Sequence, residues 1–163
     1  MSEQNGRFFH LTDTQYAYLL GRNSGFKAGG ISTHAYYEFR NTLDIPRLEQ
    51  ALNDVIAAHS MLRTVILPSG MHHELPQVPR YQIEVTDLSG KTEAEIETAI
   101  AEKRQKYSHY VFPSDQWPLF KVEFFRLPEE INHMFLSIDL MIADGSSIHI
   151  FIRDIVNSRN GVN

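Results

Sequence analysis

Apolar positions repeat at intervals of three and four residues in two long stretches, which is the spacing of one helix face. The first stretch covers residues 42–62, and its apolar stripe is Ile45, Leu48, Leu52, Val55, Ile56 and Leu62. Asp44 precedes the stripe and Pro46 stands in its first turn, a combination that commonly opens a helix. The pattern predicts a long helix with one buried side.

The second stretch covers residues 93–107, where Ile96, Ala99, Ile100 and Tyr107 fall at helical spacing. Thr92 and Glu95 stand just ahead of it, three positions apart, and form a capping box. A hydroxyl and a carboxylate in this arrangement satisfy free N–H groups at a helix start. The pattern predicts a second long helix.

Two shorter helices are predicted near the chain ends. Thr12 and Gln15 form another capping box, and Gly21 suits the position just after a helix that ends there. Near the other end, Ser146 or Ser147 should cap a final helix that runs to about residue 158.

Between the helices the chain is rich in β-branched and aromatic residues. Five stretches are predicted as strands: 31–40, 63–68, 81–89, 118–127 and 132–142. A short extended piece falls within 69–76, and a glycine-bearing loop covers 23–30. Because strands and amphipathic helices interleave throughout, we expect a single domain over residues 1–163, an α/β (α+β) sandwich in which helices cover a sheet.

The composition narrows the class of protein. The chain has 163 residues, a formal net charge of −5 and no cysteine. The absence of a lysine and arginine cluster argues against nucleic acid and anionic membranes as partners. The lack of cysteine excludes a disulfide scaffold and thiolate chemistry on this chain. The first residues lack the apolar segment of a signal peptide, so a cytoplasmic location is expected.

Several residues are of types that often bind ligands, but we expect them to have structural roles in this chain. His72-His73 is expected to lie in a surface loop rather than at a metal, because no third ligand has a useful spacing. Gly29-Gly30 lacks a phosphate-loop pattern and reads as a turn. Trp117 is expected to anchor the core, and no serine has the context of a nucleophile elbow.

The stretch 137–147 carries two aspartates in an apolar run, which raises the question of their partners. Alternation places Asp139 on one strand face with Phe135, Ser137 and Met141, and Leu140 on the other. Asp144 precedes Gly145 and the start of the last helix, whose positive end favours a carboxylate. We expect Arg63 to pair with Asp144. A structural role as ion-pair posts is favoured over direct catalysis, because nothing nearby supplies an acid or nucleophile.

This stretch resembles the core motif of the heterocyclization domains of nonribosomal peptide synthetases, Asp-x-x-x-x-Asp-x-x-Ser. The motif matches at Asp139, Asp144 and Ser147. Ordinary condensation domains carry His-His-x-x-x-Asp-Gly at this place. Relative to that pattern, Asp139 replaces the first histidine and Leu140 replaces the second, which is usually catalytic.

Two further stretches are similar to motifs of the same family. Residues 8–22 resemble its opening motif, Phe-Pro-Leu-Thr-x-x-Gln-x-Ala-Tyr-x-x-Gly-Arg, with His10 in place of the proline. Residues 58–75 resemble its second motif, Arg-His-x-Met-Leu-Arg followed by Gly-x-Gln. There Ala58 replaces the first arginine, and His73 falls near the usual glutamine. The resemblance runs from Phe8 to about Asn157.

The resemblance implies a chloramphenicol-acetyltransferase-like lobe with a mixed sheet, the N-terminal one of two lobes that enclose a tunnel. Asp139, Asp144 and Ser147 would lie at that tunnel, with Asp144 and Arg63 as a structural ion pair. The second lobe, with the residues thought to drive cyclodehydration, has no counterpart in this chain. The chain alone is therefore expected to be inactive, with no certain catalytic residue and no metal.

The same resemblance implies the reaction and the partners. An acyl or peptidyl thioester would join the amine of a Cys, Ser or Thr thioester, and cyclodehydration would give a thiazoline or oxazoline. No cofactor is expected on the chain itself, since substrates arrive on phosphopantetheine arms of carrier proteins. The uncovered lobe surface should favour self-association. Two alternatives stay open: a non-catalytic module that binds carrier proteins, and a small oligomeric acyltransferase, against which Leu140 counts.

Overall fold

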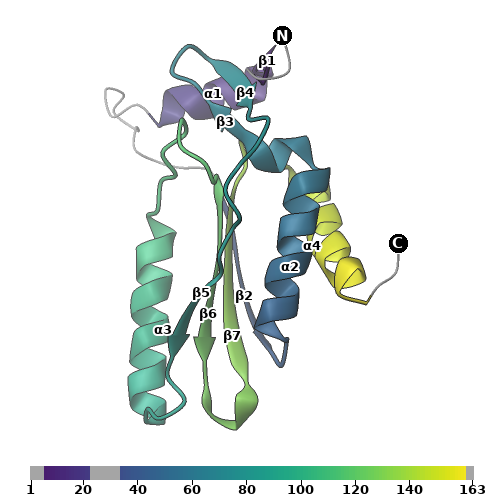
Figure 1. Cartoon of the computed structure of the whole chain (residues 1–163). Helices are drawn as coiled ribbons and strands as arrows, with labels where there is room; N and C mark the ends of the chain where they lie inside the picture. Colours follow the sequence, from purple (N-terminus) through teal and green to yellow (C-terminus); the bar gives the residue numbers. More distant parts are fainter. Residues whose placement is uncertain (1–5, 23–33, 161–163) are drawn as a thin grey trace.

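The computed structural model describes residues 6–22 and 34–160 of the chain. The predicted loop at 23–30, and with it the turn expected at Gly29-Gly30, lies outside the described residues. The fold is built around a mixed sheet with helices on both faces (Figure 1).

The main sheet has four strands in the order β2-β7-β6-β5. Their bounds are β2 His34–Asn41, β5 Glu84–Asp87, β6 Phe120–Arg126 and β7 Asn132–Asp139. Strand β7 pairs antiparallel with both of its neighbours, whereas β5 pairs parallel with β6. The predicted fold class, a mixed sheet covered by helices, is confirmed.

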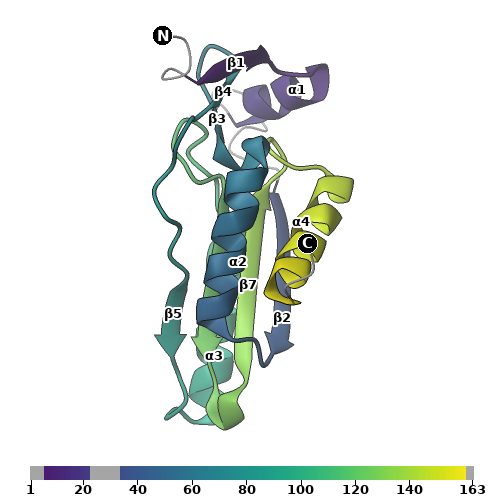
Figure 2. The ribbon, with the colours of Figure 1, turned by 45° about the vertical axis from the view of Figure 1, so that its right-hand side comes forward.

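Helices cover the sheet in two layers. Helix α3 (Glu93–Ser108) lies on one face, and α2 (Ile45–Ala58) and α4 (Gly145–Asn160) lie side by side on the other (Figures 1 and 2). The larger apolar core lies under α2 and α4, and it includes the fully buried Leu52, Phe120, Phe124 and Ile138. A smaller core under α3 includes Ile100 and Phe135.

The helix starts predicted at Thr12, Asp44 and Thr92 are confirmed, whereas the predicted end of α2 is wrong. The hydroxyl of Thr92 caps α3, with Glu95 returning the hydrogen bond, as a capping box requires. Helix α2 stops at Ala58 instead of continuing to residue 62, because His59 is extended. The 3₁₀ turn Ser60–Arg63 (η1) follows and redirects the chain.

A small antiparallel sheet lies beyond one end of the main sheet, together with α1 (Asp13–Gly21) (Figure 1). Its strands, in the order β1-β4-β3, are β1 Arg7–His10, β3 Thr64–Ile66 and β4 Met71–Glu74. The surface loop predicted for His72-His73 is wrong, since both residues belong to β4. His72 is buried beside Phe9, and His73 stacks on Phe8 at 4.3 Å between ring centroids.

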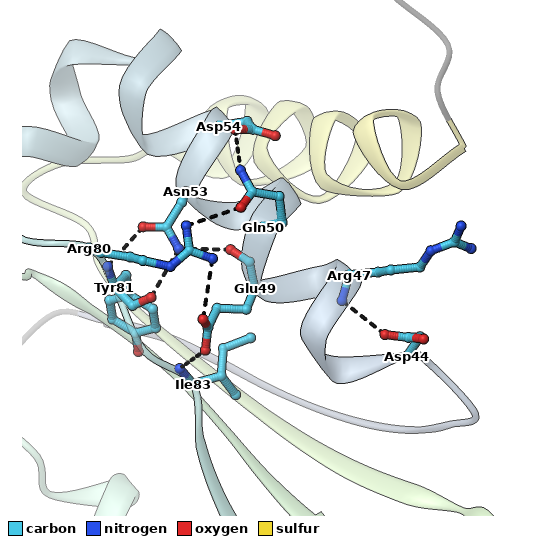
Figure 3. A network of polar contacts seen from close by, with 9 residues as sticks. All are labelled: Asp44, Arg47, Glu49, Gln50, Asn53, Asp54, Arg80, Tyr81 and Ile83. Carbon is cyan, nitrogen blue, oxygen red and sulfur yellow. Dashed lines mark hydrogen bonds and ion pairs between the residues drawn. The ribbon is translucent and has the colours of Figure 1, made fainter.

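Side chains of α2 hold the irregular segment that leads into β5, as Figure 3 shows. Asn53 accepts a hydrogen bond from Tyr81 N at 2.8 Å and donates one to Tyr81 O at 2.9 Å. Glu49 accepts from Ile83 N at 3.0 Å, and Arg80 lies 3.4 Å from the same carboxylate. The predicted strand 81–89 therefore begins only at Glu84, because its first residues bond to a helix instead of a strand.

Two carboxylates, one buried and one half-buried, join α3 to the sheet. Glu123 on β6 contacts Lys121 at 2.7 Å, Lys103 at 3.2 Å and the hydroxyl of Tyr107. Burial opposes the charge of Glu123, but the hydrogen bonds from Lys121 and Tyr107 prevail and lower its pKa to about 2. The result is a polar layer inside an otherwise apolar interface.

Glu38 on β2 is the second of these carboxylates. The guanidinium of Arg104 donates two hydrogen bonds to it at 2.8 and 2.7 Å, and His133 lies 3.1 Å away. The bonds from Arg104, helped by Tyr36, lower the pKa of Glu38 to about 2. Charge-assisted bonds of this kind fix the position of α3 along the sheet.

Candidate functional site

The candidate site begins where β7 ends. The strand stops at Asp139, three residues earlier than predicted, and the chain turns there with Ile142 N donating to Asp139 O at 3.1 Å. Helix α4 starts at Gly145, so residues 140–144 form a short turn between strand and helix. The motif residues lie around this turn.

Asp139 is fully buried and forms an ion pair inside the protein. One terminal nitrogen of Arg22 lies 2.5 and 2.6 Å from its two carboxylate oxygens, and Met141 N donates to it at 2.9 Å. The expected internal ion pair of Asp139 is confirmed. Its cation was missed by sequence reasoning, although Arg22 ends the opening motif, which was the available signal.

The contacts of Asp139 decide what it can do. Both oxygens accept hydrogen bonds from Arg22, and the side chain of Arg22 is itself only 7% exposed. A carboxylate held in this way cannot reach a substrate proton, because general-base catalysis requires direct hydrogen-bond contact with the group that loses it. Asp139 therefore positions the turn.

Asp144 acts as the cap of α4. Its Oδ1 accepts hydrogen bonds from the backbone N and the hydroxyl of Ser147, both at 2.7 Å. The serine cap predicted for this helix is wrong, because the aspartate already occupies that position and Ser147 is its donor. Two of the three motif residues are thus in direct contact, and Asp139 lies at the other end of the turn.

The predicted ion pair between Arg63 and Asp144 is wrong. Arg63 donates to the backbone oxygens of Ile56 and Ala57 at 2.7 and 2.6 Å and lies 3.3 Å from Glu74. The turn η1 folds Arg63 back onto the end of α2, where exposed carbonyls and the negative end of the helix dipole favour a cation.

A cavity of about 500 Å³ opens between α1 and this turn. It is lined by Thr12, Thr14, Gln15, Tyr18, Met61, Leu140, Ile142, Ala143, Asp144, Gly145 and Ser147. Gln15 ties the two walls together, since its Nε2 donates to Met141 O at 2.9 Å. The contribution of α1 to this wall was not predicted, because nothing local in the sequence indicates which elements meet.

The chemistry available on this wall is limited. Leu140 lines the cavity at the position where condensation domains carry their second histidine. Asp144 is the carboxylate on the wall, and its Oδ1 is engaged as a helix cap. In the part of the chain that the structure describes, no three His, Cys, Asp or Glu side chains come together to bind a metal ion.

The same described residues contain no helix of sufficient length and hydropathy to span a membrane.

Comparisons with known proteins agree with this geometry. Residues 7–159 match the model of the Condensation domain family. The chain is 39% identical over 146 residues to Bacitracin synthase 1 of Bacillus licheniformis, and the match covers 90% of the chain but 3% of that protein. It is 31% identical to Pyochelin synthetase PchF of Pseudomonas aeruginosa, covering 88% of the chain and 8% of that protein.

A solved structure is similar over nearly the whole chain. The EpoB NRPS cyclization-docking bidomain from Sorangium cellulosum superposes with a TM-score of 0.89 at 34% identity, covering 96% of this chain and 32% of the bidomain. The chain thus spans about a third of that structure and a much smaller share of the curated synthetases. On the family match and the shared fold, the chain belongs to the Condensation domain family and corresponds to the N-terminal region of such a domain.

Proposed function

We propose that residues 1–163 form the N-terminal lobe of a heterocyclization domain of a nonribosomal peptide synthetase. The amine of a Cys, Ser or Thr thioester would attack an upstream acyl thioester, form an amide and release the donor thiol. The side-chain thiol or hydroxyl would then attack the new amide carbonyl, and loss of water would give a thiazoline or oxazoline. Both substrates would arrive on phosphopantetheine arms of carrier proteins.

One observation carries the proposal: the ion pair of Arg22 and Asp139 stands beside an apolar Leu140 in the cavity wall. A condensation domain would present imidazole here. The replacement of both histidines removes that base and leaves a buried carboxylate with a matched cation. Similarity to the EpoB cyclization-docking bidomain and to Phenyloxazoline synthase MbtB of Mycobacterium tuberculosis, at 34% and 28% identity, supports the same class.

In this proposal the residues of the chain position substrates rather than transfer protons. Arg22 and Asp139 fix the turn, Gln15 joins that turn to α1, and Asp144 orients the start of α4. Rigid supports of this kind hold reacting groups in a productive geometry. The second lobe would supply the opposite wall and the groups that drive cyclodehydration, so the chain alone should not turn over.

A turnover assay by mass spectrometry tests the proposal. The chain is mixed with an acyl-loaded donor carrier protein and a cysteinyl-loaded acceptor carrier protein, with and without a separately expressed second lobe. A product lighter than the amide by one water, formed only with both lobes, is the expected result. An amide that never loses water would contradict heterocyclization. Carrier binding without any product would favour the non-catalytic binding module.

A further inference from the structure

A second cavity adjoins the candidate site. It is a groove of about 340 Å³ between the end of α2 and the first turns of α4. Its lining residues are Ala58, His59, Ser60, Met61, Leu62, Ile138, Ile142, Ala143, Ser147, Ile150 and Phe151. On α4 the contributing residues are Ser147, Ile150 and Phe151, which stand at the spacing of one helix face.

The lining selects against charged ligands. No Lys, Arg, Asp or Glu side chain is among the lining residues, and the floor is made of buried Leu62, Ile138 and Ile142. The polar lining residues are His59, Ser60 and Ser147. An ion placed against the apolar floor would lose its hydration, whereas an apolar group would gain from burial. The volume lies at the small end of ordinary ligand pockets and is sufficient for one bulky hydrocarbon group.

The groove lies next to the cavity at the motif. The two share Met61, Ile142, Ala143 and Ser147, so these residues stand at the boundary between them. Asp144 and Gly145 line only the motif cavity, and Ile150 and Phe151 line only the groove. A molecule that reacts beside the motif can therefore place one of its substituents in the groove.

Ala58 sets the entrance of the groove. It is exposed at the end of α2 and lines the groove without lining the motif cavity. The methyl group of Ala58 adds neither bulk nor charge to the wall of the groove, which favours an apolar occupant.

We infer that the groove binds the side chain of the acyl donor, and that this side chain is bulky, apolar and uncharged. The inference rests on the proposed function, which requires two substrates. The acceptor is Cys, Ser or Thr, and its side chain must stay at the reacting carbonyl to form the ring. A separate apolar groove beside that centre is therefore available only to the donor.

Binding of S-acyl pantetheine thioesters to the chain tests the inference without any turnover. Isovaleryl, benzoyl, acetyl and succinyl thioesters are titrated while the methyl signals of labelled Ile and Met are followed by NMR. We expect the isovaleryl and benzoyl thioesters to bind at least about tenfold more tightly than the acetyl or succinyl thioester, since each added hydrocarbon group is worth about tenfold or more in an apolar pocket. The Ile150 and Met61 signals should shift.

Two matched variants locate the binding. Ala58→Trp fills the groove entrance and should weaken binding of the isovaleryl and benzoyl thioesters at least about tenfold, with little change for the acetyl thioester. Ala57→Trp adds the same side chain at the neighbouring exposed position, which lines a different cavity, and should bind like the native chain. Circular dichroism of both variants confirms that they are folded.

The outcomes separate this inference from the proposed function. Equal binding of all four thioesters, or full binding by Ala58→Trp, overturns the groove assignment, even if the two lobes together form a heterocycle. Tight binding in the groove without any heterocycle in the two-lobe assay supports an acyl-binding groove and overturns the proposed function instead.

Discussion

The buried ion pair of Arg22 and Asp139 affects both the stability of the protein and the turn beside the cavity. Both side chains are almost inaccessible to water, and each supplies the charge that the other requires. Removing one partner leaves the other charged group buried without compensation, which is far more costly than losing an exposed pair. The pair also closes the turn on which the cavity wall is built.

We expect Asp139→Ala to lower the free energy of unfolding by about 3–5 kcal/mol, because Arg22 would remain buried and unpaired. Urea unfolding at neutral pH measures the change. Arg40→Ala serves as the control: the Arg40–Glu97 pair is about 60% exposed on both sides, and its loss should change stability by less than about 1 kcal/mol. Equal effects of the two substitutions would refute the structural role of Asp139.

Asp144 allows a test that separates the cap from the charge. Asp144→Asn keeps an oxygen that can accept from Ser147 N but loses the negative charge at the helix N-terminus, and should cost less than about 1 kcal/mol. Asp144→Ala removes the cap of α4 as well as the charge and should cost about 1–2 kcal/mol. Thermal unfolding of both variants gives the comparison. A stable Asp144→Asn variant that is inactive in the two-lobe assay would assign chemistry to the carboxylate.

Even the local contacts of the site were predicted only in part. Asp144 and Ser147 are three positions apart at a helix start, but the cap was predicted to be a serine instead of Asp144. The cation for Asp139 comes from Arg22, 117 positions away, and no periodicity indicates that distance. Arg63 was assigned to the wrong partner because the apolar pattern of α2 continues to Leu62. That pattern conceals the 3₁₀ turn Ser60–Arg63, which redirects the Arg63 side chain.

At the scale of elements, α2 acts as a template for the segment before β5. The side chains of Asn53 and Glu49 replace the backbone partners that a neighbouring strand would provide (Figure 3). Each bond satisfies a backbone group in a partly buried position, where an unpaired group costs about 1–3 kcal/mol.

Asn53→Ala should therefore lower the free energy of unfolding by about 2–3 kcal/mol, since both backbone groups of Tyr81 lose their partner at once. Chemical unfolding monitored by fluorescence measures it. Asp54→Ala is the control on the same helix, because Asp54 is exposed and bonds only to Gln50 among the contacts in Figure 3. A loss below about 1 kcal/mol for Asn53→Ala would show that the segment is held by its apolar residues alone.

Strand β2 forms one edge of the main sheet among the described residues. Tyr37 and Phe39 project from it, about 38% exposed, with their rings stacked 6.1 Å apart. An edge strand with exposed aromatic side chains invites pairing with another chain, which fits the self-association expected from the sequence.

We expect the sedimentation coefficient of the chain to rise with concentration, and Phe39→Lys to reduce that rise by placing a charge on the edge. Val111→Lys is the matched control, since Val111 is similarly exposed but lies in a loop outside the sheet. A native chain that stays monomeric at high concentration would contradict the expectation.

Most helices and strands could be predicted, because the sequence signals that define them are local. The same reliance on local signals explains the wrong predictions. Capping boxes at Thr12 and Thr92 act within one turn, so they can be identified in the sequence without knowledge of the fold. The strand at β7 was predicted too long because Leu140 and Ile142 continue its apolar pattern. They are apolar for another purpose, since both line the cavity.

At the scale of the whole molecule, acid should weaken the fold in two stages. Burial lowers the pKa of His72 and His133 below the usual 6.5, so protonation favours the unfolded chain as the pH falls below that value. The pKa values of Glu38 and Glu123 fall from the usual 4.5 to about 2. Their stabilisation is complete above pH 4.5 and is lost as the pH falls toward 2.

Urea unfolding between pH 7 and pH 2 should therefore show a shallow decline below pH 6.5 and a steeper one below pH 4.5. Glu123→Gln should flatten the steeper part and cost about 1–3 kcal/mol at neutral pH, because Lys103 loses its carboxylate partner and Lys121 keeps only Glu84, 3.8 Å away. Glu102→Gln, exposed on α3, should leave the profile unchanged. A profile that Glu123→Gln leaves equally steep would assign the acid sensitivity to other groups.

The pairing of β2 with β7 has a consequence for how the chain folds during synthesis. Glu38 and His133 meet across these strands although they are 95 positions apart. Strand β2 therefore leaves the ribosome early and has no partner in the main sheet until β7 has been made. Such long-range closure slows folding and exposes the unpaired strand to other chains. Production at a lower temperature or with a chaperone should consequently raise the yield of folded protein more than any change at the cavity.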